Sequence, residues 1–253
     1  MCRHIGYLGP VCSVGELLTR GQHCLQTQAF APRDMRGGGT INADGYGAAW
    51  WTEDGAARYH SAAPMWTDTA GVQTLNAVHS TAVLAAVRSA TVGMPVVATA
   101  AAPFTDGRWA FSHNGVVRGW PDAMASLAQQ LPVTDLMTMD APTDAALLWA
   151  LLRDRLRRSE PADAVAELVC EVDAAAPGSR LNLLLSDGVQ LVATAWEHSL
   201  SYLDGAGSAL DQPDHVVIAS EPYDDDPAWQ SVPDHSLVTA RPGAVTVTEL
   251  ESR

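Results

Sequence analysis

Residues 143–175 read TDAALLWALLRDRLRRSEPADAVAELVCEVDAA and predict two consecutive helices in the middle of the chain. Thr143 or Asp144 is well placed to cap the first helix, and Pro161 falls near the first turn of the second. We expect Cys170, inside the second helix, to be a packing residue. Apolar residues recur on one face of each helix, at Leu147, Leu148, Leu151, Leu152 and Leu156, then at Val165, Leu168, Val169 and Val172.

Strands are predicted on the N-terminal side of these helices. An aromatic strand is expected over 46–51, and the apolar run 79–88 is typical of a strand buried on both faces. Residues 109–113 alternate apolar and polar types and lead into Asn114-Gly115, a strong turn signal.

Strands return on the C-terminal side. We expect a hairpin about Asp187-Gly188, a strand within 215–223, and a second hairpin about Pro242-Gly243. Strands, then helices, then strands, without regular βαβ alternation, indicate an α+β fold in one domain.

The composition excludes several classes of protein. Hydrophobic residues make up 47% and charged residues 17% of the 253, which is ordinary for a globular chain. With 29 acidic and 15 basic residues the net charge is −14, so nucleic acid is not expected as a partner. No apolar run is long enough to cross a membrane, and no signal-peptide pattern opens the chain. Four cysteines do not form a disulfide framework, and we expect a reduced, cytoplasmic protein.

Cys2 follows the initiator methionine directly, in the opening stretch MCRHIGYLG. Removal of the methionine would leave Cys2 with both a thiol and a free α-amine, whose pKa is about 7.7–8.0. A nucleophile that carries its own base is suited to covalent catalysis. The alternative is an exposed terminal residue without a function.

Four further residues have a structural and a functional interpretation each. Arg88 ends a buried strand, where it forms either a structural salt bridge or a site for an anion. Asn114 and Gly115 form either a plain hairpin turn or a pair of oxyanion donors. Asp144 either caps its helix or holds a ligand ammonium group.

A metal site is not expected. The cysteines and histidines of the first 24 residues match no common zinc spacing, and no motif for another cofactor is present. These residues are Cys2, His4, Cys12, His23 and Cys24.

Taken in order, five motifs resemble those of the class II glutamine amidotransferases, a family of N-terminal nucleophile hydrolases. They are MCRHIG, INADGYG, VRSAT, SHNG and PTDAA. The resemblance implies a four-layer αββα sandwich and one domain of this type over residues 2–253. It also implies a small γ-glutamyl substrate and no cofactor, and it leaves the oligomeric state open.

The resemblance implies a role for each matching residue. Cys2 matches the nucleophile, with its α-amine as the base. Arg88 matches the group that binds the α-carboxylate of the γ-glutamyl substrate, and Asp144 the group that binds its α-ammonium. Asn114 and Gly115 match the oxyanion donors.

Thr91 and His113 belong to the VRSAT and SHNG motifs and are assigned to substrate binding.

A closer resemblance, to amidohydrolases of ergothioneine biosynthesis, is carried by APRDMRGG, RYHSAAPMWTDT, LAAVRSATVGMP, FTDGRW, HNGVV and ASEPYDDD. It implies hydrolysis of a γ-glutamyl amide of hercynylcysteine sulfoxide, a leaving group that carries a trimethylammonium. Aromatic rings and carboxylates suit such a cation, and the candidates are Trp66, Tyr223, Asp224 and the other acids of SEPYDDD. The alternative is that this stretch is only a solvated acidic loop.

The chain departs from the broader family at Tyr46, Ala102 and Ala145-Ala146, which puts plain glutamine in doubt as the substrate. Two alternatives stay open: a glutaminase or glutathione-type γ-glutamyl hydrolase of the same fold, and an inactive binding protein. Because the family-like elements fill the chain and no synthase segment remains, we favour hydrolysis over transfer of ammonia.

Overall fold

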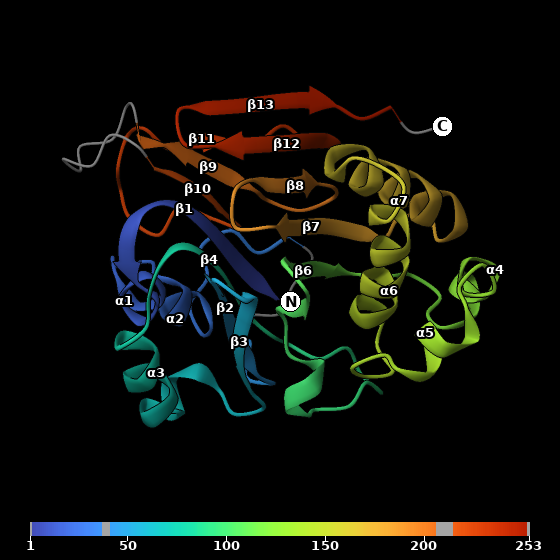
Figure 1. Ribbon diagram of the computed structural model, residues 1–253, viewed down its shortest axis with the longest axis horizontal. Helices are drawn as coiled ribbons and strands as arrows, with labels where there is room; N and C mark the ends of the chain where they lie inside the picture. The colour runs from blue at the N-terminus through green and yellow to red at the C-terminus, as the bar shows by residue number, and fades with distance from the viewer. Residues whose placement is uncertain (1, 37–40, 206–214, 252–253) are drawn as a thin grey trace.

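Two antiparallel sheets form the centre of the protein in a computed structural model, which describes residues 2–36, 41–205 and 215–251 (Figure 1). In this part of the chain the first sheet has the strand order β11 (Gln230–Ser231), β9 (Ser201–Asp204), β10 (Val216–Ala219), β1 (Arg3–Ser13), β4 (His79–Val87), β2 (Tyr46–Thr52) and β3 (Gly55–Ser61). The second has the order β13 (Ala244–Glu249), β12 (Ser236–Arg241), β8 (Leu191–Ala195), β7 (Arg180–Ser186), β6 (Trp109–Val116) and β5 (Phe104–Asp106).

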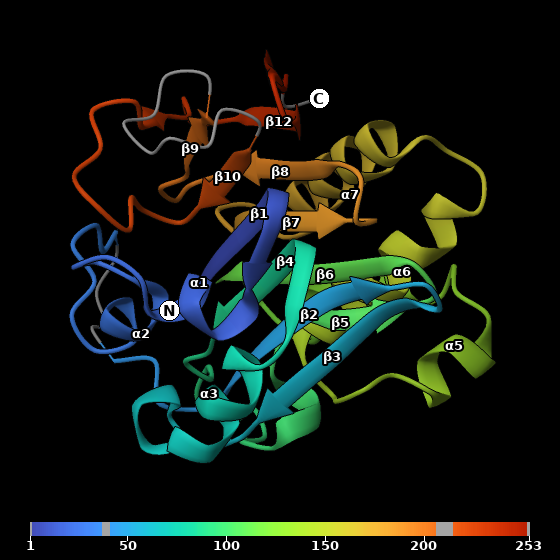
Figure 2. The ribbon, with the colours of Figure 1, turned by 60° about the vertical axis from the view of Figure 1, so that its left-hand side comes forward.

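Helices cover the outer face of each sheet (Figures 1 and 2). On the first sheet lie α1 (Val14–Thr19), α2 (Leu25–Gln28) and α3 (Thr69–Asn76). On the second lie α4 (Ala125–Ala128), α6 (Asp144–Leu156) and α7 (Pro161–Ala175), with α5 (Val133–Met137) beside α6. Short 3₁₀ turns span η1 (Met65–Thr67), η2 (Ala98–Ala100) and η3 (Asp122–Met124).

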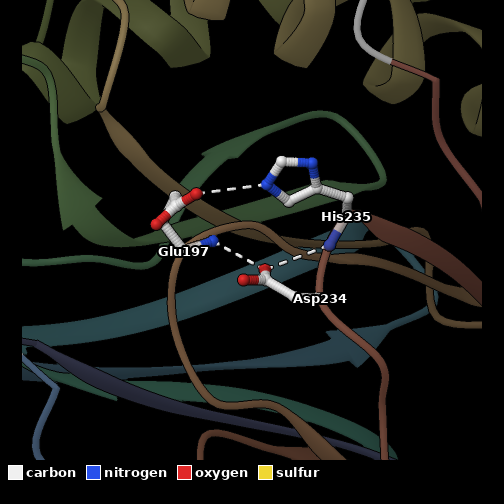
Figure 3. A group of neighbouring side chains, drawn as sticks. All are labelled: Glu197, Asp234 and His235. Atoms are coloured by element: carbon white, nitrogen blue, oxygen red, sulfur yellow. Dashed lines mark hydrogen bonds and ion pairs between the residues drawn. The ribbon is translucent and has the colours of Figure 1, made fainter.

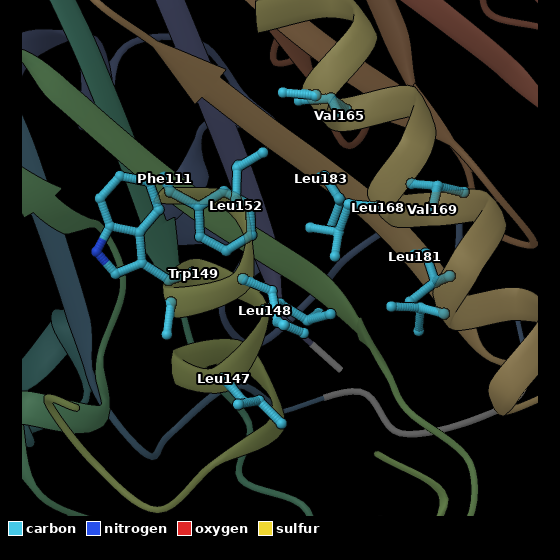
Figure 4. Close-up of a cluster of buried hydrophobic side chains, with 14 of the residues drawn as sticks. Phe111, Leu147, Leu148, Trp149, Leu152, Val165, Leu168, Val169, Leu181 and Leu183 are labelled. Atoms are coloured by element: carbon cyan, nitrogen blue, oxygen red, sulfur yellow. The ribbon is translucent and has the colours of Figure 1, made fainter. Parts of the chain in front are cut away.

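Three apolar clusters follow from the alternation of side chains along the strands. In β1, Ile5 and Tyr7 face the helices while Leu8 faces the second sheet. In β6, Phe111 faces the helices and stacks on Trp149 of α6 with ring centroids 5.5 Å apart (Figure 4). One cluster therefore lies between the sheets and one under each helix layer, which confirms the expected αββα sandwich.

Both predicted central helices are present. The first begins at Asp144, and the side chain of Thr143 is its cap, because its hydroxyl accepts the Ala146 N–H at 3.2 Å. The second begins with Pro161 in its first turn. Cys170 is only partly buried, so it packs less closely than expected.

The predicted turn at Asn114-Gly115 is wrong. Both residues continue β6, where Asn114 pairs with Asn182 and Gly115 with Leu181 of β7. Neither residue has the positive φ that a type I′ turn requires. A turn signal is local, whereas this segment is held extended by its partner strand.

The hairpins about Gly188 and Gly243 are confirmed, and both glycines have positive φ, at 85° and 74°. The strands predicted over 46–51, 79–88 and 215–223 correspond to β2, β4 and β10. Among the described residues, no helix is both long and apolar enough to cross a membrane.

Candidate active site

One cavity collects residues that lie far apart in the sequence. Its walls come from the residue before β1, the end of β4 with the loop after it, β6, and the start of α6. The cavity therefore joins both sheets and the helix layer of the second. Six of the predicted site residues line it: Cys2, Arg88, Thr91, His113, Gly115 and Asp144.

Strand pairing places Cys2 in this cavity. Arg3 pairs with Val87 in the antiparallel β1–β4 ladder, so Cys2 lies opposite Arg88. The Cys2 thiol donates to the Ser89 carbonyl at 3.9 Å and is partly exposed. A nucleophile in this position is open to the cavity while its backbone is continuous with a central strand.

Arg88 is a buried cation without a buried anion. Its exposed fraction is 8%, and one guanidinium N–H donates to the Pro95 carbonyl at 2.9 Å. Its backbone is fixed by bonds to Asp44 and Gly45, both of 2.9 Å or shorter. Within the described part of the chain no carboxylate lies within 4.0 Å of the guanidinium, so the structural salt bridge considered above is not formed.

Asp144 is the matching buried anion, with an exposed fraction of 6%. Its carboxylate accepts the backbone N–H of Val117 at 3.1 Å and that of Ala145 at 2.8 Å. The positive end of the α6 dipole favours a carboxylate here. Of the basic side chains that the structure describes, none lies within 4.0 Å of it.

A buried charge without a counter-ion costs free energy unless a ligand compensates it. Arg88 and Asp144 present one such charge of each sign to the same cavity. A ligand with a carboxylate and an ammonium group would compensate both. The cavity thus has the electrostatics of a zwitterion site beside a thiol.

His113 and Gly115 form the wall contributed by β6. The His113 Nε2–H donates to the Arg180 carbonyl at 2.9 Å. A Cβ on Gly115 would lie 1.8 Å from the same carbonyl oxygen. Glycine is therefore required at 115 by the approach of the β7 backbone.

Asn114 is fully buried and does not line the cavity. Its amide nitrogen donates to the Ser220 hydroxyl at 3.0 Å, on the face of β6 turned toward the first sheet. The residue lies between two that do line the cavity, but its side chain is engaged elsewhere in this structure.

Tyr223 and Asp224 also lie apart from the cavity. Tyr223 is 4% exposed in the core under the first sheet, where burial raises the pKa of its phenol to about 12. Asp224 accepts the Trp229 indole N–H at 2.7 Å and lines a second, acidic cavity with Asp34 and Glu221. Trp66 packs edge-to-face on Phe30.

The sequence does not predict that the ionisable residues next to Cys2 are buried. Arg3 is fully buried, with its Nε 4.0 Å from Glu221 and another N–H donor on the Asp34 carbonyl. Burial lowers the pKa of His4 and of His198 to about 3, so both rings are neutral at pH 7. Arg3 and His4 stand in the opening MCRH, but nothing in that spacing indicates their burial.

Glu197, Asp234 and His235 gather on the surface of the second sheet (Figure 3). Their potential ligand atoms lie within 4.8 Å of one another. One oxygen of Asp234 already accepts the backbone N–H groups of Glu197 and His235, at 2.8 and 3.0 Å. The hydrogen bonds of these three residues thus connect two loops.

A family model described as class-II glutamine amidotransferases matches residues 17–206. The chain belongs to this family. It is 41% identical over 252 residues to the γ-glutamyl-hercynylcysteine sulfoxide hydrolase of Mycolicibacterium smegmatis, covering 99% of this chain and 100% of that protein. A protein of the same name from Mycobacterium tuberculosis strain CDC 1551 is 41% identical over 253 residues, covering 99% and 97%.

A solved class-II glutamine aminotransferase domain protein from Silicibacter pomeroyi has a similar fold. Its TM-score is 0.68 at 19% identity, over 98% of this chain and 99% of that one. At this identity the likeness supports the sandwich fold alone.

Proposed function

We propose that this protein hydrolyses the γ-glutamyl amide bond of γ-glutamyl-hercynylcysteine sulfoxide to glutamate and hercynylcysteine sulfoxide, a step of ergothioneine biosynthesis. The observation that carries the proposal is the pair of uncompensated charges, Arg88 and Asp144, in the cavity of Cys2. The two relatives above bear the name of this activity and match nearly the whole chain.

In the proposed reaction Arg88 binds the α-carboxylate of the γ-glutamyl group and Asp144 its α-ammonium. These contacts orient the scissile carbonyl, two methylenes away, over the Cys2 sulfur. Such positioning accounts for a large part of the rate of a bimolecular attack.

The α-amine that methionine removal frees on Cys2 takes the thiol proton, and the sulfur attacks the γ-carbonyl. In this proposal the oxyanion is bound by the Gly115 N–H, which lines the cavity, and by the Asn114 amide, whose nitrogen is hydrogen-bonded to Ser220 in the free protein. The C–N bond then breaks as the Cys2 ammonium returns the proton to the leaving amine. Water hydrolyses the thioester, releases glutamate and restores the thiol.

We propose that the hercynyl leaving group extends toward the acidic cavity that contains Asp224. The wall of this cavity includes Glu221 and Trp229. Glu221 also lies close to Arg3, the residue next to Cys2. Carboxylates and an aromatic face suit a trimethylammonium group. Tyr223, although buried, supports the Trp229 ring edge-to-face at 5.2 Å.

We further propose that residues 2–253 act as one domain in the cytoplasm. The match to relatives along the whole chain supports this, and so does the lack of a disulfide bond among the cysteines that the structure describes.

The test is a comparison of kcat/KM for three γ-glutamyl amides: the hercynylcysteine sulfoxide conjugate, glutathione and glutamine. We expect the first to exceed both others by at least about 100-fold, since buried polar contacts to a leaving group discriminate strongly. Equal cleavage of glutamine would replace this substrate with the glutaminase alternative, and no cleavage of any of the three would support a binding protein.

A further inference from the structure

Ser220 connects the strand of the nucleophile to Asn114. It directly follows β10, is fully buried, and its backbone N–H donates to the His4 carbonyl at 3.0 Å. Its hydroxyl oxygen accepts the His4 backbone N–H at 2.9 Å and lies 3.0 Å from the Asn114 amide nitrogen. A single small side chain thus contacts both β1, two residues after Cys2, and the residue beside Gly115.

The hydrogen bonds around Ser220 are unbalanced. The hydroxyl oxygen receives two N–H groups, while no side chain or carbonyl in the described part of the chain accepts its own proton. The oxygen of the Asn114 amide is buried and has no partner there either. An unused donor and an unused acceptor therefore lie side by side, which is unfavourable in a buried layer.

A half-turn of the Asn114 amide gives each of these two groups a partner, and in exchange it leaves both amide N–H groups without an acceptor among the described residues. Nitrogen and oxygen of an amide have nearly the same shape and exchange places on this rotation. The Ser220 O–H would then donate to the amide oxygen, and its own oxygen would keep the His4 N–H. The amide nitrogen, with both of its N–H groups, would face away from Ser220.

We propose that Ser220 is a positioning residue that holds the Asn114 amide in this second orientation. Both amide N–H groups are then kept off the protein and are available to the oxyanion that forms when Cys2 attacks. Donors that are oriented before the reaction stabilise the transition state without reorganising. This inference rests on the proposed function and adds the residue that orients one of its oxyanion donors.

Ser220→Ala removes the orienting hydroxyl and should lower kcat by about tenfold or more, because loss of one oxyanion donor costs about 10²–10³ in kcat. The KM should stay within about twofold, since ground-state binding depends on Arg88 and Asp144. Ser112→Ala is the matched control: Ser112 is equally buried between the sheets but contacts the His4 ring at 3.3 Å instead of Asn114. Its kcat should change by less than about threefold.

A double variant separates orientation from general damage. If Ser220 acts through Asn114, then Ser220→Ala should add little to the loss already caused by Asn114→Ala. Should Ser220→Ala fail to fold, Ser220→Cys replaces it, because a thiol is a weaker donor and should give an intermediate kcat.

An unchanged kcat in Ser220→Ala, a loss equal to that of Ser112→Ala, or additive losses with Asn114→Ala would each overturn the inference. All rates are taken on whichever γ-glutamyl amide the unaltered enzyme cleaves best. Absence of turnover in that enzyme would count against the proposed function, whereas turnover retained by Ser220→Ala would count against Ser220 alone.

Discussion

Arg88 and Asp144 are each more than nine-tenths buried. Among the described residues, the charged group of each is hydrogen-bonded to backbone groups alone. In a stability-optimised core such charges would be paired with one another or replaced by apolar groups. Their retention in one cavity is consistent with binding of a zwitterion.

Arg88→Ala and Asp144→Asn should each raise KM by roughly 100-fold, since a hydrogen bond between charged groups contributes about 1.5–3 kcal/mol and each residue can form more than one. The kcat should fall less than kcat/KM does. Asp144→Asn removes the charge and retains the shape, but only one of the two oxygens that accept the Val117 and Ala145 N–H groups remains, because an NH2 group replaces the other. Steady-state kinetics over a wide substrate range gives both values.

Arg58→Ala is the control for loss of a cation. Arg58 is already ion-paired with Asp140 at 2.7 Å and does not line the cavity, so its removal should leave KM unchanged. A KM for Arg88→Ala equal to that of Arg58→Ala would place the carboxylate contact elsewhere.

At the scale of elements, Asp68 joins α3 to the edge of the first sheet. Its carboxylate accepts the Gly71 N–H at 3.0 Å as the cap of α3, and the hydroxyls of Tyr59 and Tyr46 at 2.6 and 3.1 Å. Tyr46 is one of the departures from the broader family. Its hydroxyl is thus used for a structural bond to Asp68.

Asp68→Ala should lower the free energy of unfolding by about 2 kcal/mol at pH 7, through loss of the cap and of two tyrosine hydrogen bonds. The bond from Tyr59, above all, lowers the pKa of Asp68 below its usual value. A carboxyl group whose pKa is lowered in the folded state stabilises the protein at pH values above its ordinary pKa of about 3.9. This stabilisation is lost as the pH falls through the lowered pKa.

The difference in the free energy of unfolding between the unaltered protein and Asp68→Ala should therefore be smaller at low pH. Urea unfolding at pH 7 and at pH 3 measures this difference. Asp54→Ala, in the exposed β2–β3 turn, should stay within about 0.5 kcal/mol at both pH values. A difference for Asp68→Ala that is constant with pH would contradict a role for the ionised carboxylate.

Elements with a local signal were predictable. The spacing of apolar residues gave both central helices, and Asp-Gly and Pro-Gly gave the late hairpins. The turn predicted at Asn114-Gly115 was wrong because the extended conformation of these residues depends on their pairing with β7. The Arg180 carbonyl of β7 comes so close that only glycine fits at 115. Local sequence cannot contain that information.

At the scale of the whole molecule, the site exists only when the two sheets stack. Cys2 and Arg88 come from the first sheet, whereas His113 and Gly115 come from the second and Asp144 from the helix layer above it. The sequence motifs predicted these residues through resemblance to a family, and the structure brings them to one cavity. Tyr223 and Asp224 could not be placed beforehand, because the path of the loop after β10 depends on tertiary packing against Trp229 and the first sheet.

The central claim is that Cys2, with its own free amine, carries the γ-glutamyl group as a thioester. Mass spectrometry of active enzyme, mixed with the γ-glutamyl substrate and quenched in acid, tests it directly. We expect a chain that begins at Cys2 and carries one glutamyl group on that residue, which decays as glutamate is released. Full activity in a chain that retains Met1, or a glutamyl group on any other residue, would contradict the account.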